Sequence, residues 1–241
     1  WVTSMSAQAS DMSGWLLMGL PGAAYLSGIS AGWIAIGLAI GTYLNWLLVA
    51  KRLRQYTKTA GDAITLPQFF KNRFHDESGW ISVIAAVFIL VFFLFCTASG
   101  FVSCAKLFSS VFGIPYMVSL LVGAVVVISY TFAGGFFAVC WTDFYQGLMI
   151  LGSLLIAPIF AVSLINPQAV AGIPPDYWNP VAKTSDIISG FGWGLGYFGM
   201  PHIIIRFMSL KSQKEMKKSA VIAISWTALI CFFATMVGVV G

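Results

Sequence analysis

Residues 9–22, Ala-Ser-Asp-Met-Ser-Gly-Trp-Leu-Leu-Met-Gly-Leu-Pro-Gly, place one carboxylate and two hydroxyls inside a long apolar segment. At membrane depth an ionisable group costs about 2.5–3.5 kcal/mol on insertion scales, which makes Asp11 a candidate functional residue. Gly14, Gly19 and Pro21 indicate that a helix is interrupted here, and an interruption frees backbone groups that can bind a ligand. The stretch therefore predicts half of a site for an ion and a substrate.

The composition indicates the class of protein that surrounds this stretch. The 241 residues are 59% hydrophobic and 9% charged, and the mean hydropathy is +0.89. Such a composition is typical of helical membrane proteins, whereas an outer-membrane barrel would show alternating segments of about ten residues. The net charge of +5 does not indicate nucleic-acid binding, because the basic residues lie in short loops between apolar runs. We expect an all-α integral membrane protein.

Residues that usually bind transition metals are few and scattered. The four cysteines fall in apolar segments without paired spacing, which predicts neither a disulfide nor a zinc site. His75 and His202 are too few for a histidine-rich metal centre. The sequence also lacks a nucleotide-binding loop, a nucleophile elbow and a paired acid–base centre, so we expect neither an enzyme nor a cofactor.

Long apolar runs provide the transmembrane helices. A bilayer core about 30 Å thick requires about 20 helical residues per span. Because the chain begins without Met and stops inside an apolar run, we expect a fragment of a longer protein, with residues 1–241 in one transmembrane domain. Seven spans are predicted, the first of them interrupted: 1–27, 31–50, 80–112, 116–133, 138–165, 186–208 and 219–241.

The basic residues indicate how these spans are oriented. Eleven of the thirteen lie in the loop after the second span, or at and beyond the end of the sixth. The positive-inside rule therefore places both loops, and the N-terminus of the chain, in the cytoplasm. Within the first loop, residues 64–74 predict a short amphipathic helix on the membrane surface, with Thr65 as its N-cap. Residues 166–184, which hold four prolines, predict an external loop.

A second interrupted helix is predicted at residues 190–202, Gly-Phe-Gly-Trp-Gly-Leu-Gly-Tyr-Phe-Gly-Met-Pro-His. The five glycines and one proline disfavour a uniform helix. Trp193 and Tyr197 are four residues apart, so they would share a helical face and line a pocket for a small apolar ring. The alternative is aromatic packing, with the glycines at a helix–helix contact. Two interrupted helices five spans apart fit the inverted-repeat plan of transporters.

The interruption near Asp11 offers ligands for both a cation and an anion. Carbonyl oxygens freed at Ala9 and Met12 are hard donors that suit a small cation. Amide groups at the start of the following half-helix, near Ser13 and Gly14, would face an anionic group. The alternative for Asp11 is that it caps this half-helix.

Asp143 is a carboxylate in the fifth span, within Ala-Val-Cys-Trp-Thr-Asp-Phe-Tyr-Gln-Gly. The predicted orientation places it near the cytoplasmic end of that span. It is either an interfacial residue stabilised by the helix dipole or part of a cation exit path. Its position in the sequence favours neither.

Several of these stretches resemble the sodium:solute symporter family, and the resemblance covers essentially the whole chain. It implies a five-plus-five inverted repeat of the leucine-transporter type, with two discontinuous helices. Residues 1–165 would form the first repeat, and residues 186–241 would begin the second. The motifs that carry the resemblance are residues 9–22 with Leu-Ser-Gly-Ile-Ser after them, Thr65-Leu-Pro, Cys140-Trp-Thr-Asp, and Trp193-Gly-Leu-Gly-Tyr-Phe-Gly-Met-Pro-His with Arg206-Phe-Met.

The resemblance also implies roles for individual residues. Sodium, the only metal ion expected, would bind the carbonyls of Ala9 and Met12 with Asp11 close by. Asp143 would belong to the sodium pathway. Cys96 departs from the family pattern, because it stands where a substrate-site tyrosine is expected. The other residues beside the substrate would be Ser13, Gly14, Trp193, Tyr197 and Pro201.

The implied function is a sodium-coupled symporter in the plasma membrane. Its partners would be sodium, a small amino acid with L-proline as the first candidate, and the lipid bilayer; no nucleic acid or obligatory protein partner is expected. One alternative is a different small carboxylate or other solute, with Cys96 widening the pocket. Another is the membrane sensor module of a signalling protein. A purely structural anchor would explain neither Asp11 nor the paired interruptions.

Overall fold

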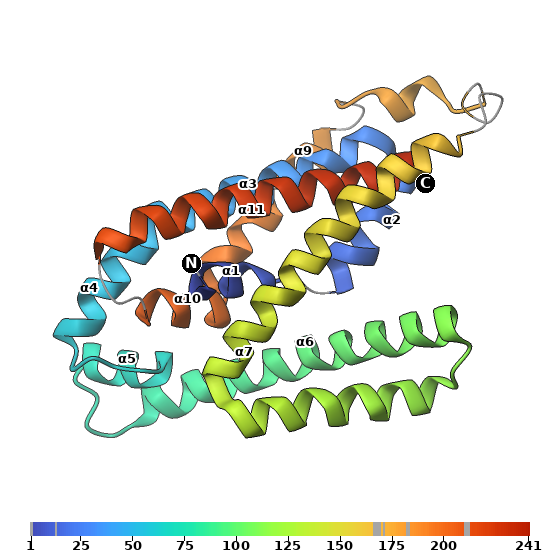
Figure 1. Cartoon of the computed structure of the whole chain (residues 1–241). Helices are drawn as coiled ribbons and strands as arrows, with labels where there is room; N and C mark the ends of the chain where they lie inside the picture. The colour runs from blue at the N-terminus through green and yellow to red at the C-terminus, as the bar shows by residue number, and fades with distance from the viewer. Residues whose placement is uncertain (1, 13, 166–169, 171, 182–183, 210–212) are drawn as a thin grey trace. The chain divides into compact units, whose positions relative to one another are not determined.

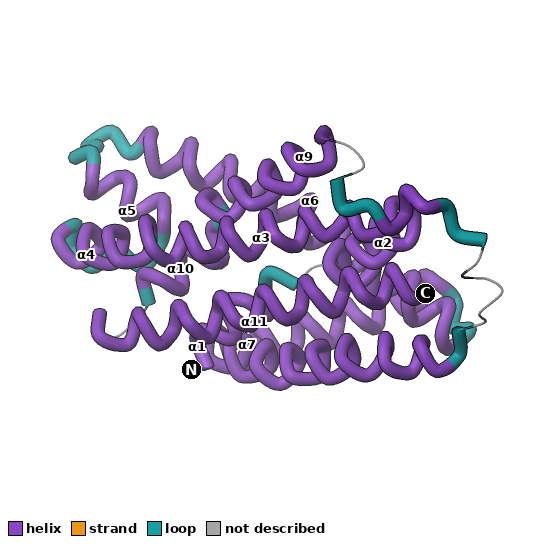
Figure 2. Tube along the Cα trace, turned by 90° about the horizontal axis from the view of Figure 1, so that it is seen from above, coloured by secondary structure: helices purple, strands orange, loops and turns teal. Residues whose placement is uncertain are grey.

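The computed structural model describes residues 1–241 except 1, 13, 166–169, 171, 182–183 and 210–212. Every regular element in the described residues is helical (Figures 1 and 2). The all-α class predicted from the sequence is therefore confirmed. The chain divides into two compact units: unit 1 is Trp1–Arg54 with Asp143–Gly241, and unit 2 is Gln55–Thr142. Among the described residues, four helical runs are long and apolar enough to cross a membrane, as expected of a membrane protein: Trp15–Thr59, Trp80–Phe112, Tyr116–Ser163 and Met216–Val240.

Unit 1 begins with an interrupted helix. Helix α1 (Val2–Ala9) ends in a turn at residues 10–12, whose amides donate to carbonyls three or four residues earlier at 2.9–3.2 Å. The chain continues as a π-helical turn, η1 (Trp15–Gly19), and as α2 (Leu20–Ser27), which has Pro21 in its first turn. The interruption predicted near Asp11 is therefore confirmed.

Gly28 ends this segment in a conformation that suits glycine. Its φ of +68° lies in a region that residues with a Cβ rarely adopt. A Cβ here would also collide with the carbonyl group of Tyr177, in the short helix η4 (Pro175–Trp178). The hydroxyl of Tyr177 donates to the carbonyl of Ala24 at 3.2 Å. Within the loop predicted at residues 166–184, η4 thus packs against the end of α2.

A long helical run follows the turn at Gly28. It begins with η2 (Gly28–Ala31) and continues through α3 (Gly32–Leu44), a π-helical segment η3 (Asn45–Ala50) and α4 (Lys51–Thr59). This run contains the predicted second span, residues 31–50. It extends beyond that span by one polar helix.

The second interrupted helix consists of α9 (Thr184–Leu195), the 3-10 turn η5 (Gly196–Gly199) and α10 (Pro201–Met208). Met200 joins the last two pieces with φ −73° and ψ 108°. Pro201 is tolerated at the first helical position, where an N–H has no partner within the helix. The carbonyl of Tyr197 accepts a hydrogen bond from Nδ2 of the buried Asn45 at 2.8 Å. The predicted interruption is confirmed and lies at residues 196–200.

Two pairs of glycines allow α3 and α9 to approach closely. A Cβ on Gly37 would collide with the carbonyl oxygen of Gly190, and one on Gly41 would collide with the backbone of Gly194. The four-residue spacing on each helix is the small-xxx-small pattern of membrane helix contacts. The glycines of 190–202 therefore serve both a helix contact and an interruption.

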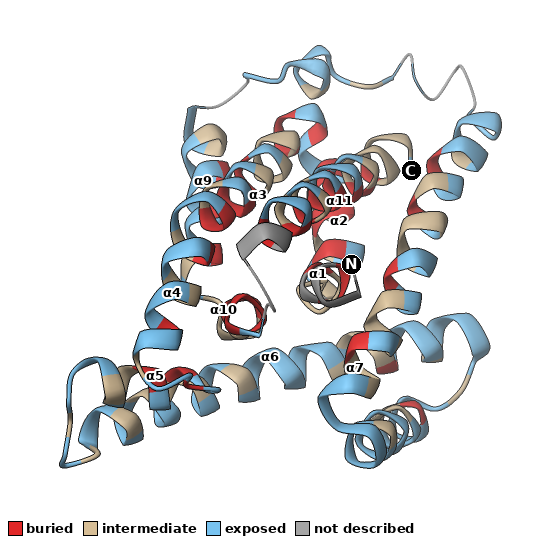
Figure 3. Ribbon diagram, turned by 60° about the vertical axis from the view of Figure 1, so that its left-hand side comes forward, coloured by how far each residue is buried: buried red, intermediate tan, exposed pale blue. Residues whose placement is uncertain are grey.

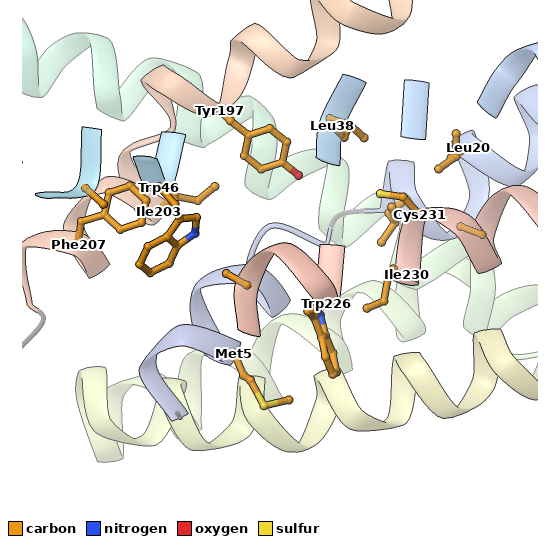
Figure 4. Close-up of a cluster of buried hydrophobic side chains, with 14 of the residues drawn as sticks. Met5, Leu20, Leu38, Trp46, Tyr197, Ile203, Phe207, Trp226, Ile230 and Cys231 are labelled. Carbon is orange, nitrogen blue, oxygen red and sulfur yellow. The ribbon is translucent and has the colours of Figure 1, made fainter. Parts of the chain in front are cut away.

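Helix α11 (Gln213–Val240) completes the core of unit 1. It packs against α1, α2 and α3, and the buried residues gather where these helices and α10 meet (Figure 3). Figure 4 shows the side chains of this cluster, which include Leu20, Ile203 and Ile230. The rings of Trp46 and Phe207 meet edge-on with centroids 4.6 Å apart.

Unit 2 contains α5 (Leu66–Arg73), α6 (Trp80–Phe112) and the first part of α7 (Tyr116–Ser163). Helix α5 confirms the short helix predicted at residues 64–74: Oγ1 of Thr65 accepts from the amide of Gln68, and the buried Leu66 and Phe69 belong to a helix that packs against α6. Gly135, with φ 55° and ψ −148°, breaks α7 between the predicted fourth and fifth spans. The total of seven spans stays a prediction.

Candidate functional site

The two interrupted helices lie side by side in unit 1. The turn at residues 10–12 meets α10 through Asp11 and His202, whose Oδ1 and Nε2 atoms are 3.3 Å apart. Beyond the turn, the indole rings of Trp15 and Trp193 stack with centroids 4.7 Å apart and an interplanar angle of 6°. Both interruptions therefore belong to one site.

Asp11 is the central carboxylate of this site. Its side chain is only 12% exposed, and that of His202 is 19% exposed. The carboxylate is also within electrostatic reach of the buried Tyr197 hydroxyl and the buried Cys231 thiol. A carboxylate so placed brings negative charge to the point where η5, α10 and α11 approach the turn. Such a charge favours a cation bound next to it.

A second carboxylate lies against Ser6 of α1 and Ser10 of the turn that follows α1. Oδ2 of Asp143, on α7, accepts hydrogen bonds from the hydroxyls of Ser6, at 2.8 Å, and Ser10. The same oxygen accepts from Nη2 of Arg206 at 3.1 Å. Ion pairs and hydrogen bonds of this kind are required where charges are buried, because an unpaired charge away from water is costly.

Arg206 connects several elements through this network. Its Nε and Nη2 atoms donate to Oγ of Ser6 at 3.3 and 3.1 Å, and Nη2 also donates to Oγ of Ser10. Its Nη1 donates to the carbonyl oxygen of His202 at 2.7 Å. Arg206 thus fixes α1 and α7 to α10, and it orders the backbone that carries the partner of Asp11.

Helix α11 is connected to α1 by a separate polar contact. Oγ1 of Thr227 donates to Oε1 of Gln8 at 2.7 Å, and both side chains are buried. Gly147 on α7 lies against Ala9, where a Cβ on the glycine would be 3.1 Å from that of the alanine. The end of α1 is therefore held on several sides.

The residues predicted to bind sodium fall into two groups in the structure. The carbonyl of Ala9 accepts from the amide of Met12 at 3.1 Å, so both belong to the turn that carries Asp11. Asp143 instead contacts Ser10 and the preceding turn of α1. Their roles as sodium ligands stay predictions.

The residues predicted to contact the substrate differ in their surroundings. Tyr197 is buried at 5% exposure, whereas Trp193 is 42% exposed and stacks on Trp15. Gly14 precedes η1, and Pro201 begins α10. Ser13 lies outside the described residues. Cys96 is an exposed residue of α6 in unit 2, and its role stays a prediction.

Sequence reasoning missed the partners of both carboxylates. Ser6, His202 and Arg206 were not proposed as site residues, although Arg206 is the only arginine or lysine inside residues 190–208. A basic residue at membrane depth is as informative as an acidic one, since both need a partner. Within the described part of the chain, no three His, Cys, Asp or Glu side chains gather to hold a metal ion.

Interrupted helices that meet inside an apolar bundle are typical of secondary transporters, which bind ions and substrates at such breaks. A sequence model of the sodium:solute symporter family matches residues 1–241. The chain belongs to this family.

Curated relatives support the family assignment along the whole chain. Sodium/proline symporter 2 of Staphylococcus saprophyticus subsp. saprophyticus is 51% identical over 247 residues, which cover 100% of this chain and 48% of that protein. The sodium/proline symporter of Staphylococcus aureus (strain USA300) is 50% identical, with the same coverage. The chain thus spans about half the length of the curated relatives it matches. These names describe transporters and not enzymes. No solved structure matched the chain.

Proposed function

We propose that this chain forms part of a sodium-coupled symporter that imports L-proline. One observation carries the proposal: two interrupted helices meet at Asp11 and His202 inside an apolar bundle. An interrupted helix offers carbonyl groups to a cation and amide groups to a carboxylate. Sodium and a zwitterionic amino acid are ligands of these two kinds. The relatives named as sodium/proline symporters support proline as the amino acid.

The sodium site of this proposal lies at the turn after α1. Carbonyl oxygens of Ala9 and Met12 are the ligands, and Asp11 strengthens binding through its charge at a largely buried position. The remaining ligands come from parts of the protein outside this chain. Asp11 therefore tunes the sodium site and does not form it alone.

The substrate site lies beside the sodium site. Backbone amides near Ser13 and Gly14 bind the carboxylate of proline, as expected at the start of a half-helix. Trp193, Tyr197 and Pro201 border the pyrrolidine ring. The stacking of Trp193 on Trp15 supports this arrangement, because it holds the indole next to η1.

The Arg206 network is the element that controls release. A path from the turn to the side where α1 begins requires α1 to part from α10, which breaks the hydrogen bonds from Arg206 to Ser6 and Ser10. Asp143 on α7 then loses the hydroxyl groups of Ser6 and Ser10, and its carboxylate oxygen becomes available to a departing sodium ion. The ion pair with Arg206, which joins α7 to α10, is not broken by this movement.

The overall plan completes the proposal. The fold is a five-plus-five inverted repeat in the plasma membrane, with the N-terminus of the chain in the cytoplasm. Sodium binding stabilises the state that accepts proline, so each ligand raises the affinity for the other. The membrane potential contributes about 2.3 kcal/mol per charge per 100 mV, which alone supports more than tenfold accumulation.

Proteoliposomes that contain the full-length protein test this function. Uptake of labelled L-proline is measured with an inward sodium gradient and, as a control, with potassium on both sides. We expect uptake with sodium only. Equal uptake under both conditions would contradict sodium coupling, and no uptake with sodium would contradict proline as the substrate.

Cys96 favours a second candidate, a symporter for another small carboxylate. A cysteine leaves more space than the tyrosine expected there, so a different solute could occupy the pocket. Competition between labelled proline and excess unlabelled carboxylates distinguishes the two candidates. Under this alternative, Cys96→Tyr would narrow the range of competitors, whereas the size-conserving Cys96→Ser would leave it unchanged.

A further inference from the structure

A groove of about 650 Å³ lies in unit 1 between residues 43–51 and the first turns of α11. Helix α11 runs beside α3 in the opposite direction, so the end of η3 and the start of α11 are at the same end of the bundle (Figure 1). Apolar or aromatic side chains line most of the groove, and two lysines stand at its end: Trp46, Leu47, Ala220 and Ile224 with Lys51 and Lys217.

We infer that this groove binds an anionic phospholipid. Lys51 follows η3 directly, and Lys217 lies near the start of α11. From that end, Leu47, Ala220 and Ile224 continue along the two helices toward the middle of the bundle. The lysines bind the phosphate of the headgroup, and the apolar wall accepts an acyl chain. Basic pockets between transmembrane helices recognise acidic lipids in this way.

The charges of both lysines are available to a ligand. Both side chains are exposed, and neither forms a hydrogen bond or an ion pair with any residue that the structure describes. The positive-inside pattern of the sequence places both at a membrane surface, at headgroup level. A lysine ammonium near such a surface attracts an acidic headgroup, and two of them around one groove favour a single anion.

Trp46 supports a ligand with a polar group. It borders the groove with only 4% of its surface exposed, and its Nε1 has no hydrogen-bond partner among the described residues. Buried indole N–H groups usually find a partner. The Nε1 atom is itself buried, so a phosphate or ester oxygen beside Trp46 would complete its hydrogen bonding when the indole turns toward the groove.

The apolar wall distinguishes a phospholipid from a free phosphate. Free phosphate would contact only the lysine end of the groove and would leave Leu47, Ala220 and Ile224 uncovered. An anion with an attached acyl chain satisfies both ends at once. The inference does not depend on the transported substrate, so its test can use lipid binding alone.

Native mass spectrometry of the full-length protein in a neutral detergent measures bound lipid directly. Phosphatidylglycerol is titrated against phosphatidylcholine with the same acyl chains. We expect tighter retention of phosphatidylglycerol by the unmodified protein. The double variant Lys51→Gln/Lys217→Gln should weaken that retention about tenfold and abolish the preference for the acidic lipid.

Two further variants separate the groove from general surface charge. Arg52→Gln/Lys218→Gln removes the same charge from two exposed neighbours that do not line the groove, and it should retain phosphatidylglycerol normally. Ala220→Phe keeps both lysines but fills the apolar wall, and it should also lose the lipid. Equal retention by the two double variants would overturn the inference. Displacement of the lipid by inorganic phosphate, or normal retention by Ala220→Phe, would overturn it in favour of a simple phosphate site.

Discussion

Arg206 donates from Nη2 to Oδ2 of Asp143 at 3.1 Å, so a guanidinium on α10 neutralises a carboxylate on α7. The two side chains are 8% and 13% exposed. Ser6 and Ser10 donate to the same carboxylate oxygen and accept from the same arginine. Four side chains therefore form one network that joins α1, α7 and α10.

Removing one member of the ion pair should destabilise the protein more than removing both. Arg206→Gln leaves Asp143 largely buried without its cationic partner, a loss that typically costs about 3–5 kcal/mol. Asp143→Asn combined with Arg206→Gln removes both charges and should recover part of this loss. Thermal unfolding in detergent measures the difference, with the exposed Lys58→Gln as a control. Equal destabilisation by the single and double variants would argue against direct coupling.

Neutralising the central carboxylate should weaken the response to sodium. Asp11→Asn preserves the shape of the side chain but removes a charge from a largely buried site. We expect the sodium concentration for half-maximal proline uptake to rise about tenfold or more, since a nearby charge acts strongly at low dielectric. Asp62→Asn, at an exposed position in unit 2, is the matched control. An unchanged sodium titration would assign Asp11 a structural role at the interruption.

The two interruptions could be predicted because their signals are local. Gly14, beside Asp11, disfavours a continuous helix in any context, and the same is true of Gly196, Gly199 and Pro201. Pro21 does not mark the break, because it lies in the first turn of α2 directly after η1. The structure places breaks at both points. Charge at membrane depth is a local signal too, and it made Asp11 a candidate functional residue. The position of Asp143 favoured no role, and only the family resemblance assigned it to the sodium pathway.

Partners could not be predicted in the same way, because they depend on tertiary packing. Ser6 and Arg206 are 200 positions apart in the sequence, and no pattern in either segment indicates the other. The contact between Gly37 and Gly190 is equally remote, so the glycines of α9 did not reveal which of them pack and which interrupt the helix. Trp193 and Tyr197 were expected to share a helical face, but Tyr197 lies in the 3-10 turn η5 after the end of α9, and it is 5% exposed whereas Trp193 is 42% exposed.

The close contact between α3 and α9 predicts that some glycines tolerate substitution by alanine and others do not. Gly37→Ala places a methyl group against the carbonyl oxygen of Gly190, so the two helices must separate. Overpacking of this kind costs about 1–3 kcal/mol. Gly192→Ala is the matched control on α9, because nothing lies within 4 Å of a Cβ there. The amount of protein in the membrane and the unfolding temperature should both fall for Gly37→Ala only. An equal fall in both variants would contradict the contact.

The hydrogen bonds of Asp76 before the start of α6 should stabilise the protein at neutral pH and lose that effect in acid. The Ser78 hydroxyl, followed by the Ile81 amide at 2.8 Å, holds the pKa of this exposed carboxyl below its ordinary value of 3.8. A lowered pKa in the folded state means that ionised Asp76 stabilises the protein above that ordinary value, and that the contribution disappears as the pH falls through the folded pKa. Asp76→Asn should therefore lower the unfolding temperature near neutral pH but not in acid below the folded pKa. Thermal unfolding at both pH values measures this, with the exposed neighbour Glu77→Gln as the control. A deficit that persists unchanged in acid would show that the carboxylate charge is not its cause.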